Sequence, residues 1–197
     1  MIGKHLRPAI VLTLLFCLIT GLVYPGVVTA LAQLLFPRQA NGSLVTANGK
    51  VVGSELIGQG FSAPYYFHSR PSAAGNGYDP TASSGTNKGP TDRKLADTLI
   101  AQAVDSLVKN DGATKGRIPS DLVTSSASGL DPHISPASAA LQVARVARER
   151  GADPRAVQAL VDRHTEGRQF GFLGDPRVNV LLLNLAVDSA FPRASTR

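Results

Sequence analysis

The chain has 197 residues, and 20 Lys and Arg against 14 Asp and Glu give it a formal charge of +6. This length suits one membrane segment and one domain of roughly 150 residues, and it argues against a second domain. A single cysteine and the absence of tryptophan exclude a disulfide framework and argue against redox chemistry at cysteine.

The basic residues are spread along the chain and form no long run. Nucleic-acid binding calls for basic residues on one face, together with aromatic stacking partners or a known module, and no such segment occurs. The nearest cluster is Arg145, Arg148 and Arg150, at the end of an expected helix. We interpret it as a solvated face that complements the helix dipole, and we expect no nucleic-acid partner.

An apolar segment near the N-terminus is long enough to cross a membrane. No ionisable acid or base occurs between Pro8 and Pro37, and about 20 apolar residues span a hydrocarbon layer of about 30 Å. We therefore expect an anchor helix and its exit at 8–36, with Pro8 in the first turn.

The charges that flank this segment predict its orientation. Lys4 and Arg7 precede it, so the positive-inside rule places residues 1–7 in the cytoplasm and residues 37–197 outside. The expected location is the cell inner membrane, with a single span and lipid as a partner. The alternative is a signal cleaved after Ala32, at an A-x-A site, which would release a soluble periplasmic binding protein.

Three residues in the anchor suggest a second role for it. Gly21 permits close approach of another helix, and Pro25 frees a backbone carbonyl near the outer half of the membrane. Tyr24 suits the aromatic belt. The segment is either a bent anchor that meets the interface or a docking face for another transmembrane helix.

Beyond the anchor the pattern favours short strands and one long loop. Asn48-Gly49 lies between two short apolar runs and predicts a hairpin with strands near 44–47 and 50–58. The aromatic stretch 64–70 suggests a third strand. Residues 71–90 lack periodicity, and a loop of this length is either a functional loop or a disordered linker. Tyr78 within it could fix the loop in place.

The remaining pattern is typical of helices. Apolar residues from Leu95 to Val108 recur at helical spacing. Three pairs then place a capping side chain before a proline, and they predict helices at about 136–150, 154–165 and 176–190: Ser135-Pro136, Asp153-Pro154 and Asp175-Pro176. The expected fold is α+β, with one anchor helix, a small β-sheet and about four further helices in a single external domain.

Asp131 and His133 stand just before the helix at 136–150. With Ser126 they could form a hydrolytic arrangement, which is the alternative function of an anchored or secreted envelope hydrolase. No nucleophile-elbow motif supports that reading, and the four His show no metal-ligand spacing. We therefore interpret Asp131 and His133 as turn and cap structure, with no metal bound and no catalytic residue in the chain.

Several motifs in order resemble a known family. They are "GSELIGQGF", "YYFHSRPSA", "YDPTASSGTNKGPT", "DLVTSSASGLDPHISPASAALQVARVARERG" and "FGFLGDPRVNVLLLNLAVD". Together with the single N-terminal span they resemble the C subunit of the bacterial Kdp potassium-transporting ATPase, over about Arg7 to Phe191.

The resemblance implies a non-catalytic accessory subunit of a membrane complex. Its partners would be a channel-like potassium-translocating A subunit, a P-type ATPase B subunit that hydrolyses ATP, and a small F peptide. The C subunit is described there as needed for assembly and as a catalytic chaperone that raises the ATP affinity of the B subunit.

A nucleotide contact is also implied, because the "SSASGLD" stretch with a downstream glutamine is likened in that family to the signature of ABC transporters. It would fall on Ser126, Ser128, Gly129 and Gln142, with ATP shared with the ATPase subunit. The other interpretation of Gln142 is a polar surface position. Since the expected topology puts these residues outside, we expect the domain to cover the outer potassium entrance and to act on ATP use through the membrane helices.

Overall fold

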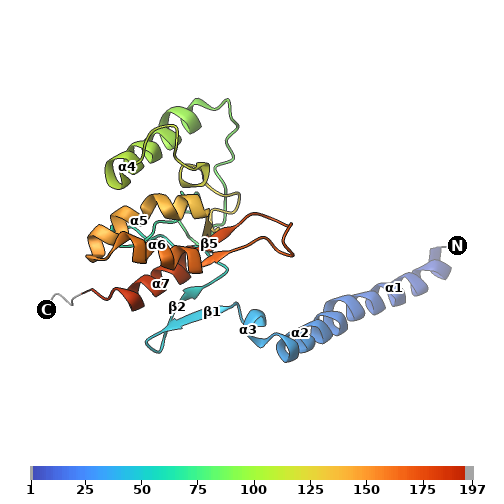
Figure 1. The fold of residues 1–197 in the computed structure, drawn as a ribbon. Helices are drawn as coiled ribbons and strands as arrows, with labels where there is room; N and C mark the ends of the chain where they lie inside the picture. Colours follow the sequence, from blue (N-terminus) through green and yellow to red (C-terminus); the bar gives the residue numbers. More distant parts are fainter. Residues whose placement is uncertain (1, 194–197) are drawn as a thin grey trace. The chain divides into compact units, whose positions relative to one another are not determined.

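The computed structural model describes residues 2–193, and the chain forms two compact units, Met1–Val52 and Gly53–Arg197. The first unit is mainly one long helix. Among the described residues, the second contains six further helical segments and the short strands of a three-stranded sheet. This mixture confirms the expected α+β class (Figure 1).

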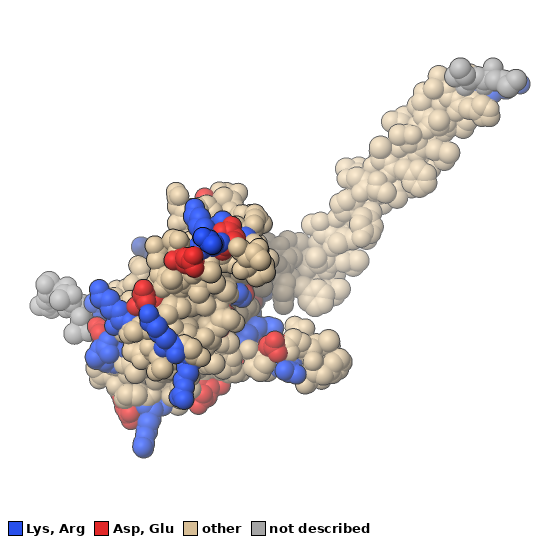
Figure 2. Space-filling view, turned by 90° about the horizontal axis from the view of Figure 1, so that it is seen from above, with Lys and Arg blue, Asp and Glu red and all other residues tan. Residues whose placement is uncertain are grey.

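The N-terminal helix runs through α1 (Ile2–Leu18), the π-helical turn η1 (Ile19–Val23) and α2 (Tyr24–Leu35). Its span Gly3–Leu35 contains an 18-residue window with a mean hydropathy of 2.3, and no residue of that window is buried. Figure 2 shows this helix without a charged side chain along most of its length. It is long and apolar enough to cross a membrane.

Two prolines lie inside this helix. Pro8 was expected in the first turn, but the helix begins at Ile2, because the preceding residues include good helix formers, and the proline takes an interior position. Pro25 lies two residues after the end of the π-helical turn, and the Tyr24 amide donates to the Ile19 carbonyl. A π turn changes the helical register where a proline cannot donate.

A short helix and a hairpin follow. After α3 (Pro37–Ala40), β1 (Leu44–Ala47) pairs with β2 (Lys50–Ser54). Asn48 and Gly49 have φ of +51° and +75°, which confirms the predicted hairpin turn. The second strand ends four residues earlier than expected, because the chain turns after Ser54.

The second unit is built around three helices, and the caps of the first two were predicted. α5 (Pro136–Arg150) begins at Ser135, which accepts from the Ser138 amide, and α6 (Pro154–Arg163) begins at Asp153, which accepts from the Arg155 amide. Helix α4 (Ala101–Asp111) continues the π-helical segment η2 (Leu95–Ile100) and confirms the helical spacing there.

The third predicted helix, at about 176–190, is present but begins at Val180, so the cap predicted at Asp175 was wrong. Residues 177–179 form strand β5 (Arg177–Asn179), and α7 (Val180–Ala190) is capped by Asn179, whose Oδ1 accepts from the Leu182 amide. The strand is central because it pairs with β3 (His133–Ile134) on one side and β4 (Thr165–Glu166) on the other. Val178 is completely buried there, so pairing and burial override the local Asp175-Pro176 signal.

The main core lies between α5, α6, α7 and the sheet, and α4 packs on α5 (Figure 1). It is made of buried apolar side chains: Phe67, Ile134, Ala139, Val143, Val146, Ala147, Val157, Leu160, Val161, Val178, Val180, Leu183 and Val187. Helix α7 is central to it, as its apolar sequence predicted.

The long loop at 71–90 has neither helix nor strand, yet it is held by specific contacts. The Ser72 hydroxyl donates to the Gly129 carbonyl at 2.6 Å and accepts from the Tyr78 amide at 2.9 Å. The Tyr78 hydroxyl donates to the Arg70 carbonyl at 2.5 Å. Ala74 is completely buried. The loop is therefore an ordered part of the second unit.

Candidate functional site

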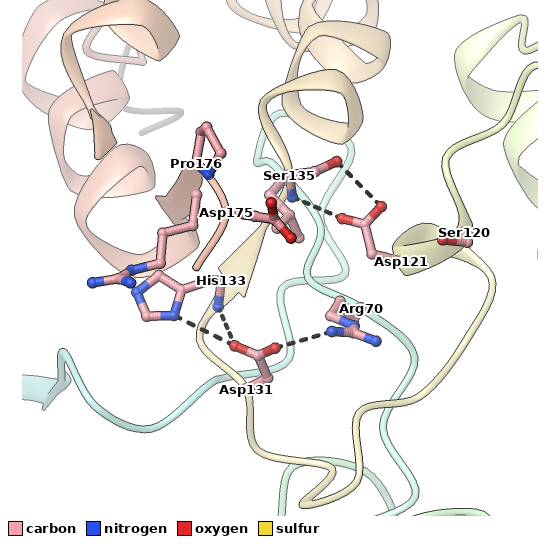
Figure 3. A pocket seen from close by; sticks show the side chains of 10 residues that line it. Arg70, Ser120, Asp121, Asp131, His133, Ser135, Asp175 and Pro176 are labelled. Atoms are coloured by element: carbon pink, nitrogen blue, oxygen red, sulfur yellow. Dashed lines mark hydrogen bonds and ion pairs between the residues drawn. The ribbon is translucent and has the colours of Figure 1, made fainter. Parts of the chain in front are cut away.

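Asp131 and His133 form a hydrogen-bonded turn just before α5 (Figure 3). Asp131 Oδ1 accepts from the His133 amide at 3.0 Å and lies 3.4 Å from His133 Nδ1. Its other oxygen accepts from Arg70 at 3.0 Å. Burial raises the pKa of Asp131, but the hydrogen bonds from His133 and the charge of Arg70 outweigh burial and hold that pKa below its ordinary value. The carboxylate is therefore ionised, and its hydrogen bonds to His133 and Arg70 stabilise the turn.

Asp121 occupies the N-terminus of α5, which is a position where helices attract anions. One carboxylate oxygen accepts from the Ser135 amide at 2.7 Å. The other accepts from the Ser138 hydroxyl at 2.7 Å and from the Ser135 hydroxyl at 3.2 Å. An internal carboxylate thus takes the place that an external phosphate would need.

A cavity of about 350 Å³ lies beside these two carboxylates. The cavity is also lined by Asp175 and Arg177, which pair with Arg168 at 3.2 Å and with Glu166 at 2.8 Å, respectively. Each charged side chain of the cavity therefore has a partner within residues 2–193. In that same part of the chain, no group of three or more His, Cys, Asp or Glu is placed to hold a metal ion.

Three of the four residues expected to contact a nucleotide, Ser126, Ser128 and Gly129, lie in the loop before α5. The hydroxyls of Ser126 and Ser128 are 3.4 Å apart, and the Ser128 carbonyl accepts from the Ser84 amide at 3.0 Å. Gly129 has φ of +68°, and a Cβ there would lie 2.5 Å from the Ser84 carbonyl oxygen. Among the described residues, Ser126 makes no hydrogen bond to His133, so the structure does not assemble a Ser-His-Asp arrangement.

The fourth residue, Gln142, is completely buried in α5, which corrects its interpretation as a surface position. Its side-chain oxygen accepts from the His68 amide at 2.7 Å, and its nitrogen donates to the His68 carbonyl at 3.1 Å. Asn184 in α7 holds Phe67 in the same way, at 2.8 and 3.0 Å. Both side-chain amides satisfy backbone groups of a segment without strand partners.

These contacts explain why 64–70 is not the strand that its composition suggested. Its backbone groups bond to side chains from helices on both sides of it, so no neighbouring strand is needed. Arg145 adds donors to the carbonyls of Pro64 and Tyr66. We call residues 64–70 the clamped segment.

The arginine cluster at the end of α5 is largely buried, which contradicts its interpretation as a solvated face. Arg145 bonds Asp111 at 2.7 Å, and each of these side chains is 2% exposed. Arg150, 1% exposed, bonds Asp188 at 2.7 Å. Arg148 alone of the three remains solvated, at 64%. Buried charges are tolerated when they are paired and hydrogen-bonded.

His68 shares this environment. Burial and the nearby charge of Arg145 lower its pKa below the ordinary value, so its imidazole is neutral. One ring nitrogen lies 3.1 Å from the Ala63 carbonyl.

The sequence reasoning missed Asn184, Arg145 and Asp111 as structural residues. A usable signal existed for Asn184, because it interrupts the apolar run "VLLLNLAV" of a helix expected in the core. A polar residue on a buried face needs a hydrogen-bond partner.

The three anchor residues lie within or beside the π-helical turn. Gly21 lies inside it, and a Cβ there would meet nothing within 4 Å, so the chain itself does not require glycine at this position. Tyr24 is 66% exposed, and Pro25 follows directly.

Within residues 2–193 the fold and the contacts define a class: one exposed apolar helix that fits single-pass membrane anchoring, joined to an α+β unit in which Gln142 and Arg145 are buried and bonded internally. A family model described as "K+-transporting ATPase, c chain" matches residues 6–189. The chain therefore belongs to this family, which confirms the resemblance.

Relatives named "Potassium-transporting ATPase KdpC subunit" agree with this assignment. The protein from Gemmatimonas aurantiaca is 65% identical over 187 residues, covering 94% of this chain and 93% of that protein. The one from Koribacter versatilis is 54% identical over 194 residues, covering 98% and 99%. The one from Methylococcus capsulatus is 58% identical over 187 residues, covering 94% and 98%.

Proposed function

We propose that this chain is a non-catalytic accessory subunit of an ATP-driven, high-affinity potassium import complex of the P-type ATPase class. The observation that carries this proposal is the combination of family membership with a single apolar span, Gly3–Leu35. One span cannot form a pore, because a selectivity filter needs rings of ligands around an axis. Potassium translocation is then the task of the A subunit and ATP hydrolysis that of the B subunit, with the F peptide as a further partner.

In this proposal residues 1–7 are cytoplasmic, 8–36 span the inner membrane and 37–197 lie outside. Lys4 and Arg7 support that orientation. The external domain covers the outer potassium entrance and clamps the A and B subunits.

Docking within the membrane uses the face that carries Gly21, Tyr24 and Pro25. What supports it is that a Cβ at Gly21 would meet nothing within 4 Å, while the π-helical turn that contains Gly21 alters the regular bonding of the helix. Small residues let the backbones of transmembrane helices approach closely.

The chain acts as a catalytic chaperone that raises the ATP affinity of the B subunit, and we propose that this effect is indirect. Burial of Gln142, with both polar atoms bonded to His68, supports the indirect route. The family-implied alternative is direct contact with ATP through Gln142 together with the loop residues Ser126, Ser128 and Gly129.

The test compares ATP hydrolysis by the complex of partner subunits purified with this chain and purified without it. We expect the chain to copurify in mild detergent, and its loss to raise the ATP concentration that gives half-maximal hydrolysis. Replacing Gly21 by Leu should weaken copurification, whereas Gly3→Leu, also in open space but at the helix start, should not. If the ATP dependence of hydrolysis were unchanged without the chain, the chaperone role would be contradicted. If the purified chain showed esterase or peptidase turnover and His133→Ala abolished it, the envelope hydrolase would be favoured.

A further inference from the structure

The connection between β4 and β5 is a closed hairpin tip with large apolar side chains on its outside. Gln169 and Leu173 bond each other through both of their backbone pairs, each at 2.9 Å. Phe170 is 86% exposed and Phe172 is 69% exposed, which makes them the two most exposed large apolar side chains described in the second unit. Leu173 beside them is 48% exposed. We call residues 169–174 the apolar tip.

The backbone of the tip turns tightly, and both phenylalanines are exposed on it. Phe170 has φ of +52°, a left-handed conformation that is unusual for a bulky residue. Gly171 and Gly174 also have positive φ, of +82° and +74°. The tight loop between the paired residues Gln169 and Leu173 accounts for these positive φ values, and it leaves the ring of Phe170 exposed.

Charge divides the hairpin sharply into an apolar end and an ionic base. The sequence "QFGFLG" of the tip has no ionisable side chain. Immediately below it Arg168 and Asp175 form an ion pair at 3.2 Å, and Glu166 and Arg177 form a second at 2.8 Å. This order matches the interfacial zone of a bilayer, where apolar side chains lie about 5–10 Å into the headgroup and acyl boundary and ionic groups stay among the headgroups.

The covalent tether keeps a bilayer within reach of the second unit. Helix α2 ends at Leu35 and the second unit begins at Gly53, so residues 36–52 span at most about 60 Å when fully extended. A domain tied so closely to a membrane-spanning helix meets lipid at high effective concentration. This constraint holds for either orientation of the anchor.

We propose that the apolar tip inserts into the interfacial zone of the phospholipid bilayer and gives the chain a second membrane contact besides its anchor helix. Insertion buries two aromatic rings and a leucine that the domain leaves in solvent. It also restricts the rotation of the domain about its tether. The inserted surface is Phe170, Phe172 and Leu173.

The absence of tryptophan provides a direct test. Phe172→Trp introduces a single indole at the tip, and Leu99→Trp introduces one at a partly exposed apolar position on η2. Each full-length variant is placed alone in nanodiscs of phosphatidylcholine and phosphatidylglycerol, with or without bromine on the acyl chains, which quenches indole at contact range. Far-ultraviolet circular dichroism confirms that both variants are folded.

We expect brominated lipid to remove most of the emission of Phe172→Trp and to change that of Leu99→Trp little. Adding Phe170→Ser to the Phe172→Trp chain should reduce the quenching, because half of the aromatic surface that holds the tip in lipid is gone. Equal, weak quenching at both positions would overturn the proposal. So would a blue shift of the tip that occurs only when partner subunits are added, since that result would assign the tip to a protein surface. No partner is present in the main assay, so its failure leaves the proposed role in the complex untouched.

Discussion

Gln142→Ala tests whether the buried glutamine is a structural clamp. The substitution removes Oε1, which accepts from the His68 amide and from Arg145 at 2.8 Å, and Nε2, which donates to the His68 carbonyl. A typical hydrogen bond contributes about 1 kcal/mol and an orphaned buried polar group costs about 1–3 kcal/mol. Because truncation also leaves a cavity, we expect the free energy of unfolding to fall by about 3–5 kcal/mol. A domain with a stability of about 5–15 kcal/mol would be severely weakened.

The assay is urea unfolding of the full-length chain in mild detergent, followed by tyrosine fluorescence. Three of the four tyrosines lie in the second unit, so the signal reports mainly on that unit. Gln158→Ala is the matched control, because Gln158 donates to Asp162 at 2.8 Å on the exposed face of α6. It should change stability by less than about 0.5 kcal/mol. If Gln142→Ala proves as stable as the wild type, the hydrogen bonds of Gln142 to His68 do not stabilise the domain.

Three further predictions concern the same unit and use the same unfolding measurement. Gly129→Ala should lower the free energy of unfolding by at least about 2 kcal/mol more than Gly116→Ala. Both glycines have left-handed φ, but only a Cβ at Gly129 would collide with a carbonyl oxygen. Equal urea midpoints for the two variants would contradict this reasoning. Because the pKa of His68 is lowered in the folded state, the unfolded state takes up the proton at a higher pH than the folded state does. The contribution of neutral His68 to stability is therefore complete above about pH 6.5 and is lost as pH falls below that value. In His68→Gln this part of the pH dependence should be absent, and an unchanged pH profile would argue against a buried neutral imidazole. Asp111→Asn leaves a buried guanidinium without its counter-charge and should cost about 3–5 kcal/mol. Asp105 forms an exposed ion pair with Lys115, so Asp105→Asn should lower the free energy of unfolding by only about 0–1 kcal/mol. Similar losses for Asp111→Asn and Asp105→Asn would refute the distinction between a buried and an exposed ion pair.

Local chemistry made much of the fold predictable. The hairpin turn at Asn48-Gly49 and the caps at Ser135 and Asp153 depend on residues close together in the chain, and the structure has all three. The pair Asp175-Pro176 had the same local signal but failed. A strand that pairs with two distant segments and buries Val178 outweighs it.

The clamped segment could not be predicted for a related reason. Its composition favours a strand, but its partners are side chains 74 and 117 residues away, those of Gln142 and Asn184. Such contacts replace a sheet neighbour only once the helices are packed. The turn at Asp131 was predictable because its bond to the amide of His133 spans two residues.

The most direct test of the proposed topology uses one exposed residue of the loop before α5. Ala127→Cys, in a chain with Cys17→Ala, leaves a single thiol on the surface of the second unit. Spheroplasts are treated with a membrane-impermeant maleimide before and after lysis. An external domain predicts full labelling of residue 127 in intact spheroplasts. Labelling only after lysis would place the domain in the cytoplasm, contradict the proposed cover over the potassium entrance and favour direct contact with ATP.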